Sequence, residues 1–128
     1  QALAEQTNPL PLGKAAFRRL GDDLSIISYG AYVHRALSAA QTLEEKHDIH
    51  CDVLDLRSLV PLDFQRIEAT VRRTGKVLLV GEDSKRGSIL ESIASRIGES
   101  LFAELDGPVR VLGGAGTGKR LDPPYLYQ

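Results

Sequence analysis

The segment at residues 53–63 constrains the fold of this chain most, because it combines a strand end, a charged turn and a helix start. It opens with an apolar run typical of a buried strand, and Asp55 and Arg57 bring charge in where that run ends. Pro61 cannot continue a central strand, and Asp63 supplies a carboxylate that can cap the helix expected to follow. The segment therefore predicts a strand-to-helix connection at the edge of a sheet, where α/β domains place ligands and partners.

Apolar patterns on both sides of this segment predict alternating strands and helices. We expect strands at residues 15–20, 24–28, 51–56, 76–81 and 109–112, and helices at 31–47, 64–74 and 88–105. The tight turn at residues 21–23 predicts that the first two strands run antiparallel. The run at 76–81 is the most apolar and is expected at the sheet centre, and Gly75 is expected to cap the helix before it. Alternation of this kind predicts an α/β fold with helices on both faces of the sheet, in three layers.

Length and composition exclude several classes of protein. The 128 residues suffice for one domain, and 16 basic against 17 acidic side chains leave a net charge of −1. Such a balance provides no field for nucleic acid or an anionic membrane, and no apolar run approaches the length of a membrane span. A single cysteine favours a reducing compartment, either a bacterial cytoplasm or the mitochondrial matrix.

The chain is expected to be part of a longer protein or a processed chain, because it opens at Gln1 and contains no methionine. Residues 1–12 have no apolar period and are interpreted as a linker from an upstream domain. Residues 13–112 form the expected domain, and 113–128 are interpreted as a tail rich in Gly and Pro.

Five short motifs, in this order and spacing, resemble the transketolase C-terminal domain. They are Pro-Leu-Gly-Lys-Ala at 11–15, Ser-Tyr-Gly at 28–30, Asp-Leu-Arg-Ser-Leu-Val-Pro-Leu-Asp at 55–63, Thr-Gly-Lys at 74–76 and Glu-Asp at 82–83. Within that family the chain is most similar to the beta subunit of the thiamine-diphosphate-dependent, decarboxylating component of 2-oxo acid dehydrogenase complexes, acting on pyruvate or branched-chain substrates. The tail at 113–128 departs from the family pattern, and residues 84–87 are more basic than is usual in the family.

The resemblance implies a five-stranded mixed sheet in three layers, with strand order 1-3-2-4-5 and the first strand antiparallel. It also implies that thiamine diphosphate and magnesium are bound by other domains, and that this chain holds no catalytic, cofactor-binding or metal-binding residue. The implied role is assembly, with an alpha subunit or alpha domain, a second beta subunit and the dihydrolipoyl acyltransferase core as partners.

Several polar side chains are candidates for the rim of the predicted sheet or for an interface. If the strands at 24–28 and 76–81 are neighbours, a crevice opens between residues 28–30 and 81–83. The candidates are Tyr29, His34, Asp55, Arg57, Glu82 and Asp83. A capping or interface role is expected for His34, and a structural role for Glu82 and Asp83. For Asp55 and Arg57, a local ion pair and an intersubunit contact are equally good interpretations.

Several other features of the sequence are compatible with different functions. The alternative function is that of a free-standing, doubly wound module for small-ligand or regulatory binding at the rim of Tyr29 and Glu82. The glycine-rich segment 113–119 has the spacing of a phosphate-binding loop, but Arg120 replaces the required hydroxyl, so nucleotide binding is rejected. His47, His50 and Cys51 lack a fourth ligand for a zinc site. The arginine pairs at 18–19 and 72–73 are expected to be solvated.

Overall fold

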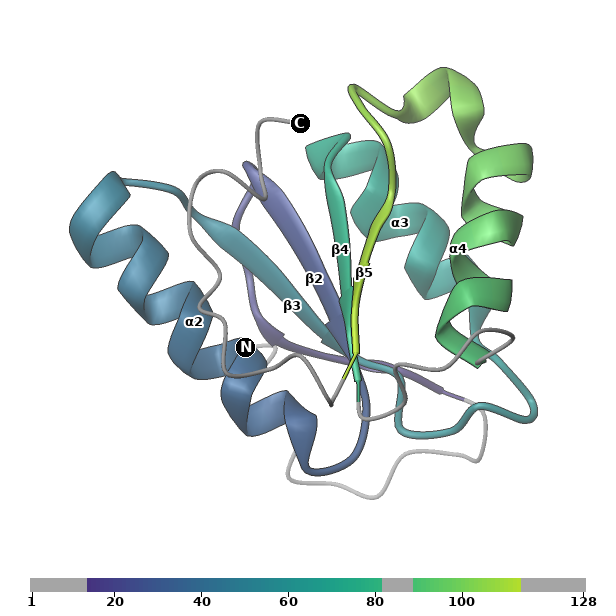
Figure 1. The fold of residues 1–128 in the computed structure, drawn as a ribbon, viewed down its shortest axis with the longest axis horizontal. Helices are drawn as coiled ribbons and strands as arrows, with labels where there is room; N and C mark the ends of the chain where they lie inside the picture. The colour runs from purple at the N-terminus through teal and green to yellow at the C-terminus, as the bar shows by residue number, and fades with distance from the viewer. Residues whose placement is uncertain (1–13, 82–88, 114–128) are drawn as a thin grey trace.

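The computed structural model describes residues 14–81 and 89–113. In chain order the elements are β1 (Ala16–Arg19), β2 (Leu24–Ser28), α2 (Tyr32–His47), β3 (Cys51–Asp55), α3 (Phe64–Thr74), β4 (Val77–Val80), α4 (Ile89–Ser100), the 3₁₀ turn η1 (Phe102–Glu104) and β5 (Arg110–Leu112) (Figure 1). None of the helices among these elements is long and apolar enough to span a membrane.

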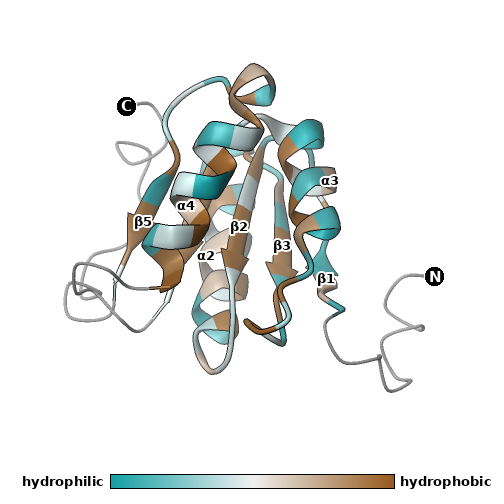
Figure 2. Cartoon of the chain, turned by 90° about the vertical axis from the view of Figure 1, so that its right-hand side faces the viewer, coloured by the Kyte–Doolittle hydropathy of each residue, from teal (hydrophilic) through white to brown (hydrophobic). Residues whose placement is uncertain are grey.

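The strands form one mixed sheet in the order β1-β3-β2-β4-β5. Strand β1 pairs antiparallel with β3, whereas β3, β2, β4 and β5 run parallel to one another. Helix α2 covers one face, and α3 and α4 cover the other, so that α2 lies behind the sheet when α3 and α4 lie in front of it (Figures 1 and 2). The predicted three-layer α/β fold, its strand order and its antiparallel first strand are confirmed.

Two apolar clusters fill the space between these layers. Strand β2 is buried along its whole length, and its side chains alternate between the two faces. Ile27 packs in the cluster beneath α3 and α4, and Ile26 packs in the cluster beneath α2. Because both faces of the sheet are covered by helices, β2, β3 and β4 are mainly apolar, and Ser25, Ser28 and Asp52 are the polar side chains buried in them.

The expected tight turn between the first two strands is wrong in one respect. Strands β1 and β2 do run in opposite directions, but β3 lies between them. The connecting segment crosses the start of β3, where a Cβ at Gly21 would lie 2.4 Å from the carbonyl carbon of His50. The side chain of Asp52 accepts a hydrogen bond from the Gly21 amide at 2.8 Å. The segment between β1 and β2 is therefore held by Asp52 of β3, and β1 and β2 do not form a direct hairpin.

Two further expectations need correction. Strand β2, and not β4, occupies the middle of the sheet, although β4 is an interior strand with β2 and β5 on either side. The helix expected to reach residue 105 ends at Ser100, because Leu101 leaves the helical region with φ −122° and ψ 24°. The change of direction keeps Leu101 in the core but turns Phe102 outward, so that Phe102 is 78% exposed although it falls on the apolar stripe of the helix expected at 88–105.

Asp52 also organises the contact between α3 and the sheet. Its carboxylate is fully buried and accepts hydrogen bonds from Thr70 Oγ1 at 2.6 Å and Arg73 Nη2 at 2.7 Å. The Ser25 hydroxyl extends this network, since it lies 2.6 Å from the hydroxyls of both Thr70 and Thr74. Buried polar groups are costly unless they are paired, so the network fixes α3 in one position on β2 and β3.

Three of the four arginines expected to be solvated form ion pairs, although the side chain of Arg73 stays 41% exposed and that of Arg18 38% exposed. Arg73 pairs with Asp52, Arg18 pairs with Asp55, and Arg19 pairs with Glu44. In each case the guanidinium ties a strand or helix to an element distant in the sequence. Arg72 is exposed, as expected.

Candidate assembly rim

The carboxyl ends of β2, β3 and β4 lie side by side and form the predicted rim. Ser28, the last residue of β2, joins all three, because its carbonyl accepts the Leu56 amide at 2.9 Å and its hydroxyl donates to the Val80 carbonyl at 2.7 Å. Each of these groups is buried and paired, as stable interiors require. The neighbouring positions of β2 and β4 on which the predicted crevice depends are confirmed.

Asp55 and Arg57 lie together at the end of β3, but not as the local ion pair considered above. The Asp55 carboxylate accepts the backbone amide of Arg57 at 3.0 Å and lies 3.5 Å from Nη1 of Arg18. Arg57 has a left-handed backbone with φ 64°, and its side chain is exposed. Asp55 therefore fixes the turn, while the guanidinium of Arg57 stays at the surface of the rim.

The other rim candidates differ in their surroundings. Tyr29 directly follows β2 and packs against the cluster beneath α3 and α4. His34 is exposed in the first turn of α2, so it lies at the same end of the sheet. Glu82 and Asp83 lie outside the described residues.

Residues 56–63, which we name the rim loop, connect β3 to α3 over this edge. Leu56 is fully buried, and Leu59 and Leu62 pack against the core from their partly buried positions. Between these inward side chains, Val60 is 85% exposed and Pro61 is exposed beside it. The rim loop is thus anchored by leucines while it presents an apolar tip to the outside.

Asp63 fixes the other end of the rim loop. Its Oδ1 accepts the Arg66 amide at 3.3 Å, which confirms the predicted helix cap. Its Oδ2 accepts the amide of Ala15, 48 residues earlier, at 2.9 Å, and Arg66 Nη1 donates to the Ala15 carbonyl at 3.2 Å. The sequence predicts the cap because a cap is local, but it holds no signal for the bond to Ala15.

The described residues offer little of the chemistry that catalysis needs. Burial raises the pKa of the Cys51 thiol to about 12, so the thiol stays neutral and is a poor nucleophile. His50 lies between carboxylates, with Nε2 3.1 Å from Asp48 and Nδ1 3.7 Å from Glu44. Within residues 14–81 and 89–113, no three His, Cys, Asp or Glu side chains gather closely enough to hold a metal ion.

The fold and the rim together define an α/β domain with an interior parallel sheet, one antiparallel edge strand and a strand-to-helix connection built on the motif at 55–63. Residues 13–128 match the family described as "Transketolase, C-terminal domain". The chain belongs to this family.

Relatives within the family carry related names. The chain is 49% identical to the 2-oxoisovalerate dehydrogenase subunit beta of Bacillus subtilis (strain 168), over 82% of this chain and 32% of that protein. It is 41% identical to the pyruvate dehydrogenase E1 component subunit beta of the same strain, over 85% of this chain and 33% of that protein. The chain therefore spans about a third of the length of these curated relatives.

A solved structure has the same fold. The split gene transketolase, described as an inactive beta4 tetramer, superposes with a TM-score of 0.66 at 28% sequence identity. The match covers 81% of this chain and 32% of that one.

We predict that Asp63→Ala lowers the free energy of unfolding by about 2–3 kcal/mol. About 1 kcal/mol comes from the lost helix cap, and the rest from a buried Ala15 amide left without its partner. Urea denaturation followed by circular dichroism measures the change. Asp22→Ala removes an exposed carboxylate and should change the value by less than about 0.5 kcal/mol. Equal midpoints for the two variants would show that Asp63 does not hold the rim loop.

Proposed function

We propose that this chain is the C-terminal assembly domain in the beta subunit of a thiamine-diphosphate-dependent 2-oxo acid dehydrogenase. The parent enzyme would decarboxylate pyruvate or a branched-chain 2-oxo acid oxidatively and transfer the acyl group to a lipoyl group. The two Bacillus subtilis relatives support this assignment through their names and through identities of 49% and 41%. They support both substrate classes, so the proposal includes both.

The rim loop is the observation that carries the assembly role. A partner that covers Val60 gains apolar contact, and the loop loses little conformational freedom because Leu56 and Asp63 already hold its ends. Exposed apolar groups on rigid supports are typical of interface anchors. Arg57 beside them adds a charge that can select the orientation of the partner.

The described residues do not fit the cofactor. Magnesium in such a site prefers several oxygen ligands in octahedral geometry, and a diphosphate requires converging donors. Residues 14–81 and 89–113 contain no group of three or more acidic, His or Cys side chains in metal-binding range. We therefore assign thiamine diphosphate and magnesium to other domains, and to this chain the task of keeping those domains in register.

The partners follow from this role. We propose that the rim contacts an alpha subunit or alpha domain and a second beta subunit, and that the domain also serves docking of the dihydrolipoyl acyltransferase core. A Dictyostelium discoideum relative is named as mitochondrial and several relatives are bacterial. The proposed compartment is accordingly the bacterial cytoplasm or the mitochondrial matrix.

We predict that the isolated 128-residue chain does not bind thiamine diphosphate with a dissociation constant below about 1 mM, a free energy of about −4 kcal/mol. The physical reason is the lack of a fitting donor set among the described residues. Isothermal titration with thiamine diphosphate and magnesium measures it, and the complete enzyme serves as the positive control. Saturable binding to the isolated chain would contradict the assignment and favour the ligand-binding alternative.

We predict that Val60→Asp in the complete beta subunit weakens assembly by about tenfold or more, because it places a carboxylate in an apolar contact. Sedimentation equilibrium measures the change, and the rate of 2-oxo acid decarboxylation should fall with it. Leu20→Asp is the matched control, since Leu20 is 60% exposed at the opposite end of the sheet. If the two variants assemble equally well, the rim loop is not the interface.

A further inference from the structure

We propose that the groove between α4, η1 and the segment entering β5 is a second docking surface, which takes a basic amphipathic segment of a partner polypeptide. We name it the Phe102 groove. It lies where α4 ends and β5 begins, so it is at the opposite end of the sheet from the rim loop (Figure 1). Docking in the Phe102 groove would be independent of the assembly role of the rim.

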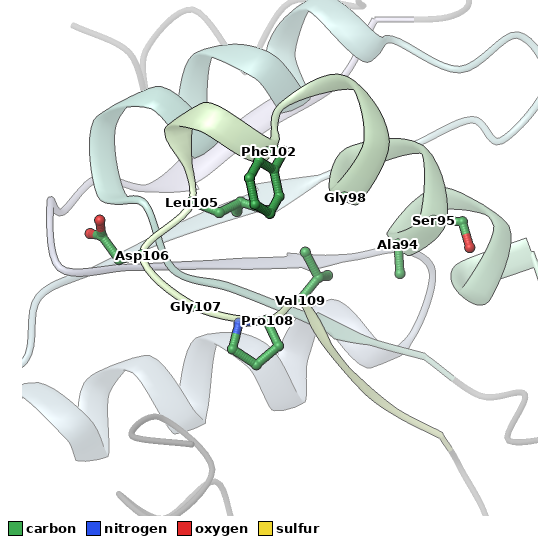
Figure 3. A pocket seen from close by; sticks show the side chains of 9 residues that line it. All are labelled: Ala94, Ser95, Gly98, Phe102, Leu105, Asp106, Gly107, Pro108 and Val109. Carbon is green, nitrogen blue, oxygen red and sulfur yellow. The ribbon is translucent and has the colours of Figure 1, made fainter.

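The shape of the groove suits apolar side chains of a partner. It has a volume of about 530 Å³ and is lined by Ala94, Ser95, Gly98, Phe102, Leu105, Asp106, Gly107, Pro108 and Val109. Figure 3 shows Phe102, Pro108 and Val109 around a shared space, with Ala94 on the neighbouring helix. Most of the lining is apolar, and the exposed Phe102 ring offers the largest single contact.

The exposure of Phe102 is built into the local backbone. Leu101 is buried and holds the end of α4 on the core, so the next residue must point away from it. The η1 turn then brings Leu105 back against the core, and Asp106 donates its amide to the Gly75 carbonyl at 2.7 Å. Both ends of this segment are therefore fixed, and Phe102 cannot move inward without breaking them.

The charge around the groove selects the partner. Residues 98–109, at the end of α4 and around η1, contain three acidic side chains and no basic one, whereas the whole chain is nearly balanced. Arg96 of α4 is turned toward α3, where its guanidinium lies 3.9 Å from the centre of the Phe64 ring. Asp106 is 64% exposed, and the Nζ of Lys76 is 4.0 Å from its Oδ2. An acidic, apolar groove complements a segment that carries Lys or Arg beside apolar side chains.

The same charges argue against other occupants. A second copy docking through the same surface would bring the acidic residues of both copies together, which is repulsive. A small ligand needs several converging polar groups, and the lining provides only Ser95 and Asp106 as polar side chains. The basic amphipathic segment is thus the occupant that satisfies both the shape and the charge.

The test measures fluorescence anisotropy of a labelled 14-residue peptide with leucine and lysine at helical spacing. The full chain should bind this peptide, and Phe102→Ala should weaken binding by about tenfold, as for an aromatic hot spot. The matched control Leu20→Ala removes an exposed apolar group beside β1, at the other edge of the sheet from β5, and should change binding by less than about twofold. Glu104→Lys should weaken binding by about threefold or more, and Glu45→Lys on α2 by less than about twofold.

Two control peptides separate the contribution of charge to binding from that of apolar contact. Replacing the lysines by glutamates should abolish binding, and replacing the leucines by serines should weaken it by about tenfold. No binding of the basic peptide up to about 1 mM would overturn the proposal, as would equal binding by the Phe102→Ala and Leu20→Ala variants. Equal binding of the serine peptide, or self-association of the chain that Phe102→Ala abolishes, would overturn it too.

Discussion

The carboxylate of Asp63 is the constraint on which the rim depends. One oxygen caps α3 and the other holds the amide of Ala15, so a single side chain joins the entry of β1 to the start of a helix 48 residues later. The rim loop is thereby closed at its far end, while Leu56 closes it at the near end by its bond to Ser28. Rigidity follows from these bonds, and an apolar tip on a rigid loop is what an assembly surface requires.

The carboxyl-terminal end of α3 is fixed by a buried hydrogen-bond network. Asp52 is buried in β3 and is paired with Thr70 and Arg73 of α3, and the Ser25 hydroxyl connects the network to β2. A buried carboxylate without these donors would be strongly unfavourable, so α3 has one position on the sheet. The two ends of α3 are therefore held by Asp63 and Asp52. Because α3 is fixed on the sheet, the rim loop that leads into it is fixed as well.

Local patterns predict most of this fold, because caps, strand lengths and crossovers depend on neighbours in the sequence. The cap at Asp63 and the left-handed end of α3 at Gly75 belong to this class. The strand order required the family resemblance, since nothing local places β3 between β1 and β2. The Asp52 network and the bond to Ala15 join residues far apart, and a single sequence carries no signal for such pairs. Phe102 was misplaced because the helical period continues past Ser100, where the backbone does not.

Hydrogen exchange of the rim loop tests the central claim most directly. The amides of residues 56–63 would be followed by mass spectrometry in the isolated chain and in the complete enzyme. If this domain fastens neighbouring subunits through the rim loop, exchange there slows by about tenfold or more on assembly, while exposed positions of α2 keep their rates. Identical rates for the rim loop in the two samples would contradict the account.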